Sequence, residues 1–400
     1  MTTIAHHADY LCEAVSRIGS ESAFQVLARA KAIEATGRRV VHMEIGEPDF
    51  DTPEHIKAAG VQAILDNYSH YTPSAGIPEL RDTIAEYAGR FRGLPGAFAR
   101  EHVVVGAGAK PIIWNLLSAI LDPGDELIYA DPAYPAYASA AGYLEAKAIP
   151  VALLESRDWR LDLDELAAKI TPKTKALVIN SPHNPTGGVL TREDLETIAA
   201  LAQRHDFLVI SDEIYSRNVY GSAFESITRI DGMRDRTIVI DGFSKAYAMT
   251  GWRLGYCIAP KAIAETVTLF NNNTFLCVAT FVQRAGIAAL TGDDEPVQRM
   301  NGIFRERRDA IVSGLNAIPN VSCTLPEGAF YAFPNVSRIT RNDKHLAQWL
   351  LENAGVACLG GSSFGAAGAG YLRFSYAASL DDIGWALDQL RDALPRYEPA

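Results

Sequence analysis

The chain of 400 residues contains few cysteines, and none of them forms a Cys-x-x-Cys pair. The five positions are Cys12, Cys257, Cys277, Cys323 and Cys358. An odd, scattered set argues against a disulfide framework or a zinc site and is typical of reduced thiols in a cytosolic protein. We therefore expect a cytoplasmic location and no metal centre.

Long apolar runs and an excess of positive charge are also missing. The longest nearly apolar stretch, residues 111–121, contains Asn115 and Ser118 and is too short to cross a bilayer. The formal net charge is −11, whereas nucleic acids and anionic membranes attract clustered positive charge. We expect neither as a partner. Small anionic substrates stay compatible with the sequence, because a few buried arginines can dominate the charge of a pocket.

The middle of the chain alternates short β-branched runs with longer segments of helical spacing, such as residues 192–203. The expected strands are His102–Val105, Glu126–Tyr129, Lys175–Ile179, Phe207–Ile210, Thr237–Ile240 and Leu254–Ile258. Alternation of this kind predicts an α/β fold with crossover helices and a mostly parallel sheet. Ligands of such sheets bind at the carboxyl ends of the strands.

The pattern changes after about residue 290, and the length of the chain already favours two lobes. A long charged helix is expected over 295–315 and a final helix over 380–394. Short strands are expected around Val321, Phe330, Val356 and Leu372. With the helical stretch 24–35, these form a smaller α+β domain. We predict a large domain of residues 46–290 and a small domain of 1–45 and 291–400.

The most informative stretch is residues 241–255, where Lys245 closely follows the apolar run Thr237–Ile240. A lysine at the end of a buried strand is costly unless its amine is neutralised or used covalently. An imine to a cofactor aldehyde is one such use, and Arg253, eight residues later, suits a phosphate. The pair points to pyridoxal phosphate, although a lone lysine after a strand is usually a solvated loop charge.

Two strand ends carry groups suited to a planar, phosphorylated ligand. The run Val105–Lys110 has two glycines and opens an apolar helix, whose free amides would bind phosphate; a tight turn needs the same glycines. Tyr134, in a proline-rich segment after the next strand, suits stacking on a ring. Simple packing within that loop explains it equally well.

The remaining strand ends supply polar groups. Asn184, in a rigid segment with two prolines and a glycine, would donate to a phenolate oxygen. Asp212 would pair with a protonated pyridine nitrogen, the alternative being a helix cap, and Tyr215 would also bond the phenolate. Arg373 lies in a run of alternating polar and apolar residues, and its guanidinium would bind a carboxylate bidentately. The alternative is an exposed arginine in a salt bridge.

Taken together, these residues resemble the fold-type I, pyridoxal-phosphate-dependent class I/II aminotransferases, near the bacterial aspartate and aromatic aminotransferases. The resemblance runs from Ser20 to Leu394 and includes the motifs Ile45–Phe50 and Tyr71–Arg81. It implies a large domain with a mostly parallel seven-stranded sheet and a smaller α+β domain. It also implies a homodimer whose sites are shared across the interface.

The resemblance assigns roles to individual positions. Lys245 would be the imine (Schiff base) lysine and proton shuttle, and Asp212 and Tyr215 would be the other catalytic residues. The cofactor-binding positions would be Gly108, Ala109, Lys110, Tyr134, Asn184, Asp212, Tyr215, Ser244, Lys245, Arg253 and, from the partner subunit, Tyr71. The positions that bind the substrate carboxylate would be Gly46, Asn184 and Arg373.

The sequence departs from the family pattern at two places. Many relatives carry a phosphate-binding serine three residues before the lysine, where this chain has Gly242. The stretch Ile18–Ser22 differs from the usual lining of the substrate mouth, and Glu21 there would repel an acidic side chain. Lys110 has the opposite implication, because some relatives acting on acidic substrates carry a lysine there. The identity of the substrate therefore stays open.

The leading hypothesis is an aminotransferase that moves the amino group of an L-amino acid to a 2-oxo acid. The alternative on the same fold is a pyridoxal-phosphate-dependent lyase or a carbon–carbon bond-forming or cyclising enzyme, since a fold does not decide the reaction. A non-catalytic sensor would be expected to lack Lys245, Asp212 or Arg373, and all three are present.

Overall fold

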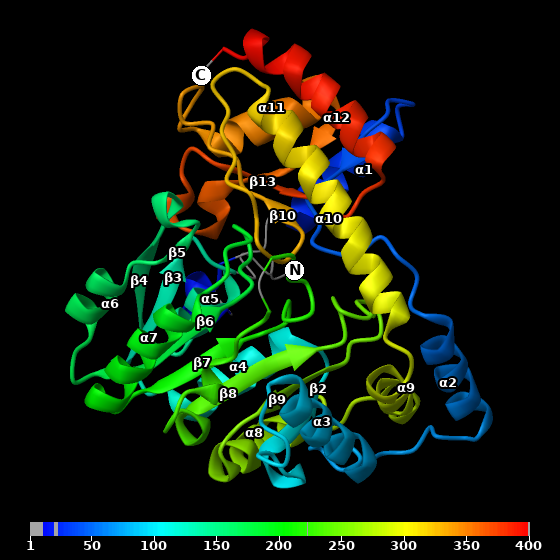
Figure 1. Cartoon of the computed structure of the whole chain (residues 1–400), viewed down its shortest axis with the longest axis vertical. Helices are drawn as coiled ribbons and strands as arrows, with labels where there is room; N and C mark the ends of the chain where they lie inside the picture. The colour runs from blue at the N-terminus through cyan, green and yellow to red at the C-terminus, as the bar shows by residue number, and fades with distance from the viewer. Residues whose placement is uncertain (1–10, 20–22, 222, 399–400) are drawn as a thin grey trace, which may run out of the picture.

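A computed structural model describes residues 11–19, 23–221 and 223–398, and one large sheet organises it (Figure 1). The strand order is β2-β9-β8-β7-β6-β3-β4-β5. The strands are β2 (Val103–Gly106), β3 (Glu126–Asp131), β4 (Lys147–Leu154), β5 (Arg160–Leu161), β6 (Thr174–Asn180), β7 (Leu208–Asp212), β8 (Thr237–Gly242) and β9 (Gly255–Ile258). Neighbours from β4 to β8 are parallel, whereas β9 is antiparallel to β2 and β8, and β5 to β4.

Helices cover both faces of this sheet because consecutive side chains of its central strands are apolar, so that both faces are hydrophobic. In β6, Ala176 and Val178 face one layer, and Leu177 and Ile179 face the other. The first layer consists of α4 (Ala109–Ile120), α5 (Ala136–Tyr143) and α8 (Lys261–Thr274). The opposite layer consists of α3 (Pro78–Phe91), α6 (Leu163–Lys169), α7 (Arg192–His205) and α9 (Thr280–Thr291). Burial on both faces is the expected state of a parallel sheet.

Two small sheets lie beyond the large one and are linked to it by the long helix α10 (Glu295–Asn316) (Figure 1). In one, β10 (Tyr331–Ala332) and β12 (Leu359–Gly360) are antiparallel to β13 (Leu372–Ser375). In the other, β1 (Val41–His42) is parallel to β11 (Val356–Ala357). The helices of this part are α1 (Ala23–Glu34), α11 (Asp343–Ala354) and α12 (Leu380–Ala393). The remaining helix, α2 (Glu54–Leu65), packs on α9.

The expected α/β architecture is confirmed, with differences in detail. The sheet has eight strands in the described residues, one more than the seven expected. The six expected strands are present, but β4 and β5 were not anticipated, because Pro150 interrupts the β4 sequence and β5 has two residues. The strand expected around Val321 is reduced to an isolated bridge between Ser322 and Asn335.

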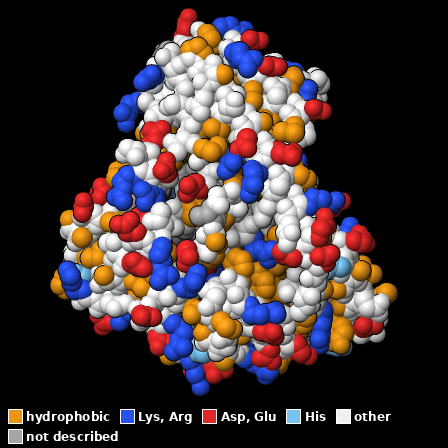
Figure 2. All heavy atoms as spheres, in the orientation of Figure 1, with side chains coloured by type: hydrophobic (Ala, Val, Ile, Leu, Met, Phe, Trp, Pro, Cys, Tyr) orange, Lys and Arg blue, Asp and Glu red, His pale blue; other side chains and the backbone are white. Residues whose placement is uncertain are grey.

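Charged side chains of both signs lie on the surface (Figure 2). Acidic and basic side chains are interspersed on the face shown in Figure 2, without a large area of one sign. Within the described ranges, no helix has the length and apolar character needed to cross a membrane.

A buried ion triad ties the end of α3 to the edge of the sheet at which β7 and β8 end. Arg92 donates to Glu213 at 2.7 Å and to Asp241 at 2.8 Å, and its side chain is fully buried. Ser211 and Ser226 donate to the other oxygen of Glu213. The triad therefore fixes the two strand ends between which the functional side chains emerge.

We predict that Arg92→Met lowers the free energy of unfolding by about 3–5 kcal/mol, because it leaves two buried carboxylates without their cation. The matched control is Arg90→Met, two residues earlier, where the side chain is exposed. It should lower the free energy of unfolding by about 0.5 kcal/mol or less. Chemical unfolding of the two variants measures the difference. Equal losses would mean that the triad contributes nothing specific.

Candidate active site

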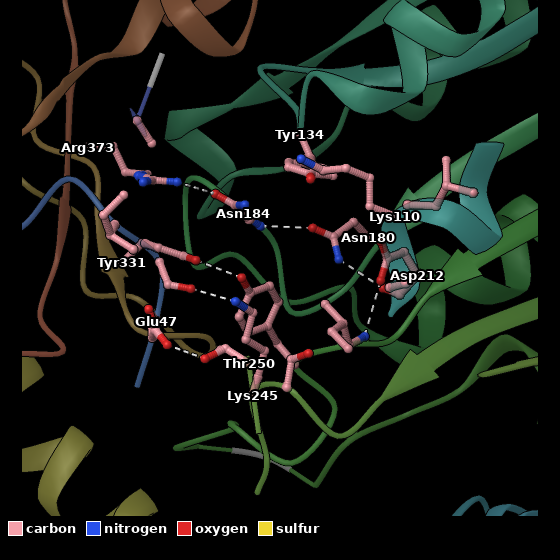
Figure 3. A pocket seen from close by; sticks show the side chains of 18 of the residues that line it. Glu47, Lys110, Tyr134, Asn180, Asn184, Asp212, Lys245, Thr250, Tyr331 and Arg373 are labelled. Carbon is pink, nitrogen blue, oxygen red and sulfur yellow. Dashed lines mark hydrogen bonds between the residues drawn. The ribbon is translucent and has the colours of Figure 1, made fainter. Parts of the chain in front are cut away.

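A cavity of about 510 Å³ lies where the parallel strands of the large sheet end, and Tyr331 of β10 and Arg373 of β13 also line it (Figure 3). Eleven of the positions expected from the sequence line it: Gly46, Ala109, Lys110, Tyr134, Asn184, Asp212, Tyr215, Ser244, Lys245, Arg253 and Arg373. These residues come from six strand ends and from the small sheets. The fold therefore brings together side chains that are up to about 330 positions apart in the chain, as its crossover topology requires.

Asp212 is the last residue of β7 and is only 4% exposed. Tyr137 donates to its Oδ2 at 2.6 Å, and the backbone amide of Ile214 donates to its Oδ1 at 3.2 Å. Burial raises the pKa of the Asp212 carboxyl to about 6, against these hydrogen bonds, which lower it. No Lys or Arg of the described residues forms an ion pair with this carboxylate, so a bound cation would relieve the cost of its burial.

A chain of amides connects Asp212 to Arg373 (Figure 3). The Asn180 side chain donates to the backbone carbonyl of Asp212 at 2.9 Å and accepts from the amide of Asn184 at 2.9 Å. Asn184 Oδ1 in turn accepts from Arg373 at 3.1 Å. Because its oxygen is used in this way, the Asn184 Nδ2 group is the part left to face a ligand.

Lys245 follows the end of β8 and reaches across the cavity. Its Nζ donates to the backbone carbonyl of Gly46 at 2.5 Å. Beside it, the Thr250 hydroxyl donates to the Glu47 carboxylate, which also lines the cavity. The amine thus lies between the strand end of the large sheet and the segment that follows β1.

The glycines near α4 form a cradle beside Arg253. Gly108 precedes α4 with a φ of 96°, and a Cβ there would lie 2.3 Å from Nη2 of Arg253. A Cβ on Gly255 would lie 2.9 Å from the amide nitrogen of Ala109. Only glycine at these positions lets the guanidinium and the helix N-terminus approach one another, which is the arrangement that favours a phosphate.

Arg373 in β13 also lines the cavity, and two aromatic rings pack against its guanidinium. Its Cζ lies 4.6 Å from the ring centre of Tyr331 and 4.8 Å from that of Phe364. One Nη donates to Asn184 and the other to the backbone carbonyl of Glu44, while Nε is buried without an acceptor in the described part of the chain. A bound carboxylate would satisfy that donor.

These observations fit pyridoxal phosphate, the cofactor that the sequence resemblance implies. The glycine cradle beside Arg253 suits its phosphate, and the buried Asp212 carboxylate suits its ring nitrogen. The Lys245 amine lines the same cavity and would react there with the aldehyde. Tyr134, with the Lys110 amine 5.5 Å above its ring, lines the same wall.

Not every expected residue lies in this lining. Tyr71 is 85% exposed and outside the cavity of its own chain, and Gly108 precedes the lining residue Ala109 without lining the cavity itself. Glu21 lies outside the described residues. Gly242 is buried in β8, where a side chain would crowd Gly255 of the neighbouring strand at 3.1 Å. The missing serine hydroxyl therefore coincides with a close approach of two backbones.

Several lining residues were not predicted. Four of them are Tyr137, Asn180, Glu47 and Thr250. Each lies within a few residues of a predicted site residue, so their position in the sequence could have indicated them. Tyr331 is different. It belongs to an apolar run that reads as core, and no local pattern distinguishes it.

The buried carboxylate predicts an unusual pH effect in the cofactor-free protein. With a folded pKa of about 6 and an unfolded value of about 3.9, Asp212 binds its proton more tightly in the native state. Its contribution to stability is therefore fully present below pH 4 and is lost as the pH rises to 6. At pH 8 we expect Asp212→Asn to have a free energy of unfolding, measured with urea, about 3 kcal/mol above that of the unsubstituted protein. At pH 4 the two should differ little. A variant that is less stable at pH 8 would contradict this expectation.

Comparison with known proteins identifies the family. The chain matches the family Aminotransferase class I and II over residues 38–389. It is 38% identical to an aspartate aminotransferase of Pyrococcus horikoshii, over 96% of this chain and 97% of that protein. It is also 38% identical to the aromatic-amino-acid aminotransferase 2 of Thermococcus litoralis, over 89% and 92% of the two chains. The structure of Thermus thermophilus aspartate aminotransferase with maleate is similar with a TM-score of 0.91 at 37% identity, over 96% of this chain and 99% of that one.

These findings confirm the family and the fold type that the sequence predicted. They also confirm an aminotransferase activity and pyridoxal phosphate as the cofactor, and they lend no support to the lyase alternative. The chain belongs to the class I and II aminotransferases, enzymes that use pyridoxal phosphate to move an amino group from an amino acid to a 2-oxo acid.

Proposed function

We propose that the cavity at the strand ends is the active site of this aminotransferase, with Lys245, Asp212 and Tyr215 as its catalytic residues. The observation that carries the proposal is a meeting of three charged groups in one cavity. The Lys245 amine, the Asp212 carboxylate and the Arg373 guanidinium all line it, although they come from different elements. A nucleophile, an anion for a ring cation and a carboxylate grip are the groups that this reaction needs.

Each part of the cofactor would have its own partners. When bound, pyridoxal phosphate supplies an aldehyde for the amino group and a protonated ring that withdraws electrons from the substrate carbon. Asp212 would hold the ring nitrogen protonated, Asn184 and Tyr215 would donate to the ring oxygen, and Tyr134 would stack on the ring. The phosphate would be held by Gly108, Ala109, Ser244 and Arg253.

The residues of the chain would then orient the substrate and move its proton. Arg373 would hold the α-carboxylate through its free donors, with help from Asn184 and from the backbone at Gly46. This orientation brings the Cα–H bond toward Lys245, which is tied to the Gly46 carbonyl at 2.5 Å in the structure. As a neutral amine, Lys245 would remove the Cα proton and return it to the neighbouring carbon of the cofactor.

For the donor we propose an acidic amino acid such as aspartate. Several of the most similar proteins are aspartate aminotransferases, and the related Thermus structure holds maleate, a dicarboxylate. Lys110 lines the cavity and supplies the positive charge that a second carboxylate would need. Glu47 in the same lining is engaged by Thr250, which reduces its capacity to repel such a substrate.

We also infer a cytoplasmic homodimer of two-domain subunits, with a large domain of residues 46–290 and a small domain of 1–45 and 291–400. The 85% exposure of Tyr71, on the chain segment that follows α2, supports its insertion into the site of the partner subunit. The free cysteines support a reducing compartment.

The proposal predicts that Lys245 carries the cofactor. Borohydride reduction of the holoenzyme, followed by peptide mass analysis, should place the cofactor mass on the peptide that contains Lys245. Lys245→Ala should lose this label and at least about a hundredfold in transamination rate, because it lacks the general base. The control Lys261→Ala, a surface lysine that is 65% exposed, should keep both. Labelling of another lysine, or near-normal turnover of Lys245→Ala, would refute the assignment.

The proposed donor predicts a selective effect of Lys110. In Lys110→Met, which removes the charge and keeps an unbranched side chain only one atom shorter, kcat/KM for aspartate should fall about tenfold or more. The value for alanine, which has no second carboxylate, should stay within about twofold, in keeping with a specific charge contact. Steady-state kinetics with the two donors measures the ratio. An equal loss for both would assign Lys110 to the cofactor instead of the substrate.

A further inference from the structure

Tyr331 is a buried residue at the centre of the site that the reaction scheme above does not use. It lies in β10, pairs with Ser375 of β13 and is only 1% exposed. Its phenol nevertheless lines the cavity (Figure 3). Three functional groups that come from separate parts of the chain lie around it.

The first contact is with the substrate grip. The Arg373 Cζ lies 4.6 Å from the centre of the Tyr331 ring and 4.8 Å from the centre of the Phe364 ring, so two aromatic rings pack against the guanidinium. A desolvated guanidinium is attracted to aromatic rings, and contacts with two of them restrict its orientation. The rings thereby restrain the group that would bind a carboxylate.

The second contact is with Tyr215. The two phenol oxygens are 2.7 Å apart, and both rings are buried. Burial raises the pKa of Tyr215 well above its usual value, so this phenol stays protonated and has one hydrogen to donate. If that hydrogen goes to the ring oxygen of the cofactor, Tyr215 must accept the hydrogen of Tyr331.

The third contact is with the segment that receives Lys245. A Cβ on Gly46 would lie 2.0 Å from the Tyr331 hydroxyl, so the hydroxyl occupies space that only a glycine leaves open. The carbonyl of the same Gly46 accepts from Lys245. The Tyr331 hydroxyl is thus fixed in position by the backbone that binds the catalytic amine.

We propose that Tyr331 is a positioning residue with two separable tasks: its hydroxyl strengthens Tyr215 as a donor to the cofactor, and its ring holds Arg373 for the substrate carboxylate. The inference rests on the proposed function, in which Tyr215 bonds the cofactor and Arg373 the substrate. A phenol that accepts a hydrogen bond becomes a better donor, because consecutive hydrogen bonds polarise one another. A planar cation that is restrained by contacts with aromatic rings loses less freedom when it binds its ligand.

The hydroxyl is tested by the pH dependence of the visible absorbance of the bound cofactor. A donor to the phenolate oxygen favours the less protonated form of the chromophore, so a weaker donor moves the midpoint to higher pH. Loss of 10–30% of a hydrogen bond to a charged group corresponds to an upward shift of roughly 0.2–0.6 pH units in Tyr331→Phe. Tyr215→Phe, which loses the whole bond, should shift the midpoint further in the same direction.

The ring is tested by the binding of succinate, a dicarboxylate that cannot react, measured by titration calorimetry at one pH well below all of these midpoints. Phe364→Leu should weaken the binding of succinate about tenfold without moving the midpoint, because it removes one of the two rings that pack against the guanidinium. Tyr331→Phe should bind succinate within about threefold of the unsubstituted enzyme, since it retains the ring. Tyr331→Leu should show both defects.

A double substitution decides whether the hydroxyl acts through Tyr215. In the Tyr215→Phe background, adding Tyr331→Phe should cause no further shift of the midpoint. An undiminished further shift, or no shift in Tyr331→Phe alone while Tyr215→Phe moves the midpoint, would overturn the inference and leave the proposed function intact. If Tyr215→Phe itself causes no shift, the assigned role of Tyr215 fails, and with it the basis of the inference.

Discussion

The site depends on one costly feature, a carboxylate buried at the end of a central strand. Asp212 is 4% exposed, and burial raises its pKa to about 6. The neighbouring acids, Glu213 and Asp241, are compensated by Arg92, whereas no such cation of the described residues is paired with Asp212. The Asp212 carboxylate therefore stays uncompensated by a cation of these residues at the edge of the sheet, where a protonated ring nitrogen would neutralise it.

The other parts of the site are arranged around that charge. The amides of Asn180 and Asn184 continue from Asp212 to Arg373, so that the ring anchor and the substrate grip belong to one hydrogen-bonded chain. The segment after β1 closes the opposite side, where Gly46 receives Lys245 and leaves room for Tyr331. The small sheets thus form part of the site, because they supply Arg373 and Tyr331, which would orient the substrate against the large sheet.

Much of this could be predicted from the sequence, for physical reasons. Parallel strands end at the same edge, so Asn184, Asp212 and Lys245 could be expected to meet before their distances were known. Strand β4 escaped prediction because Pro150 weakens its local pattern. Tyr331 escaped because its significance comes from contacts with residues more than 40 positions away, which an apolar run does not reveal. The substrate was left open because Glu21 and Lys110 have opposite implications.

The most direct test of this account is the stability that pyridoxal phosphate confers at pH 8. A ligand that binds only the native state stabilises it by about 2.7 kcal/mol at a hundred times its dissociation constant. At the same cofactor concentration, the unsubstituted enzyme should gain much more resistance to urea than Asp212→Asn, which has no charge to pair with the ring nitrogen. Equal gains would contradict the claim that the buried carboxylate is the anchor of the site.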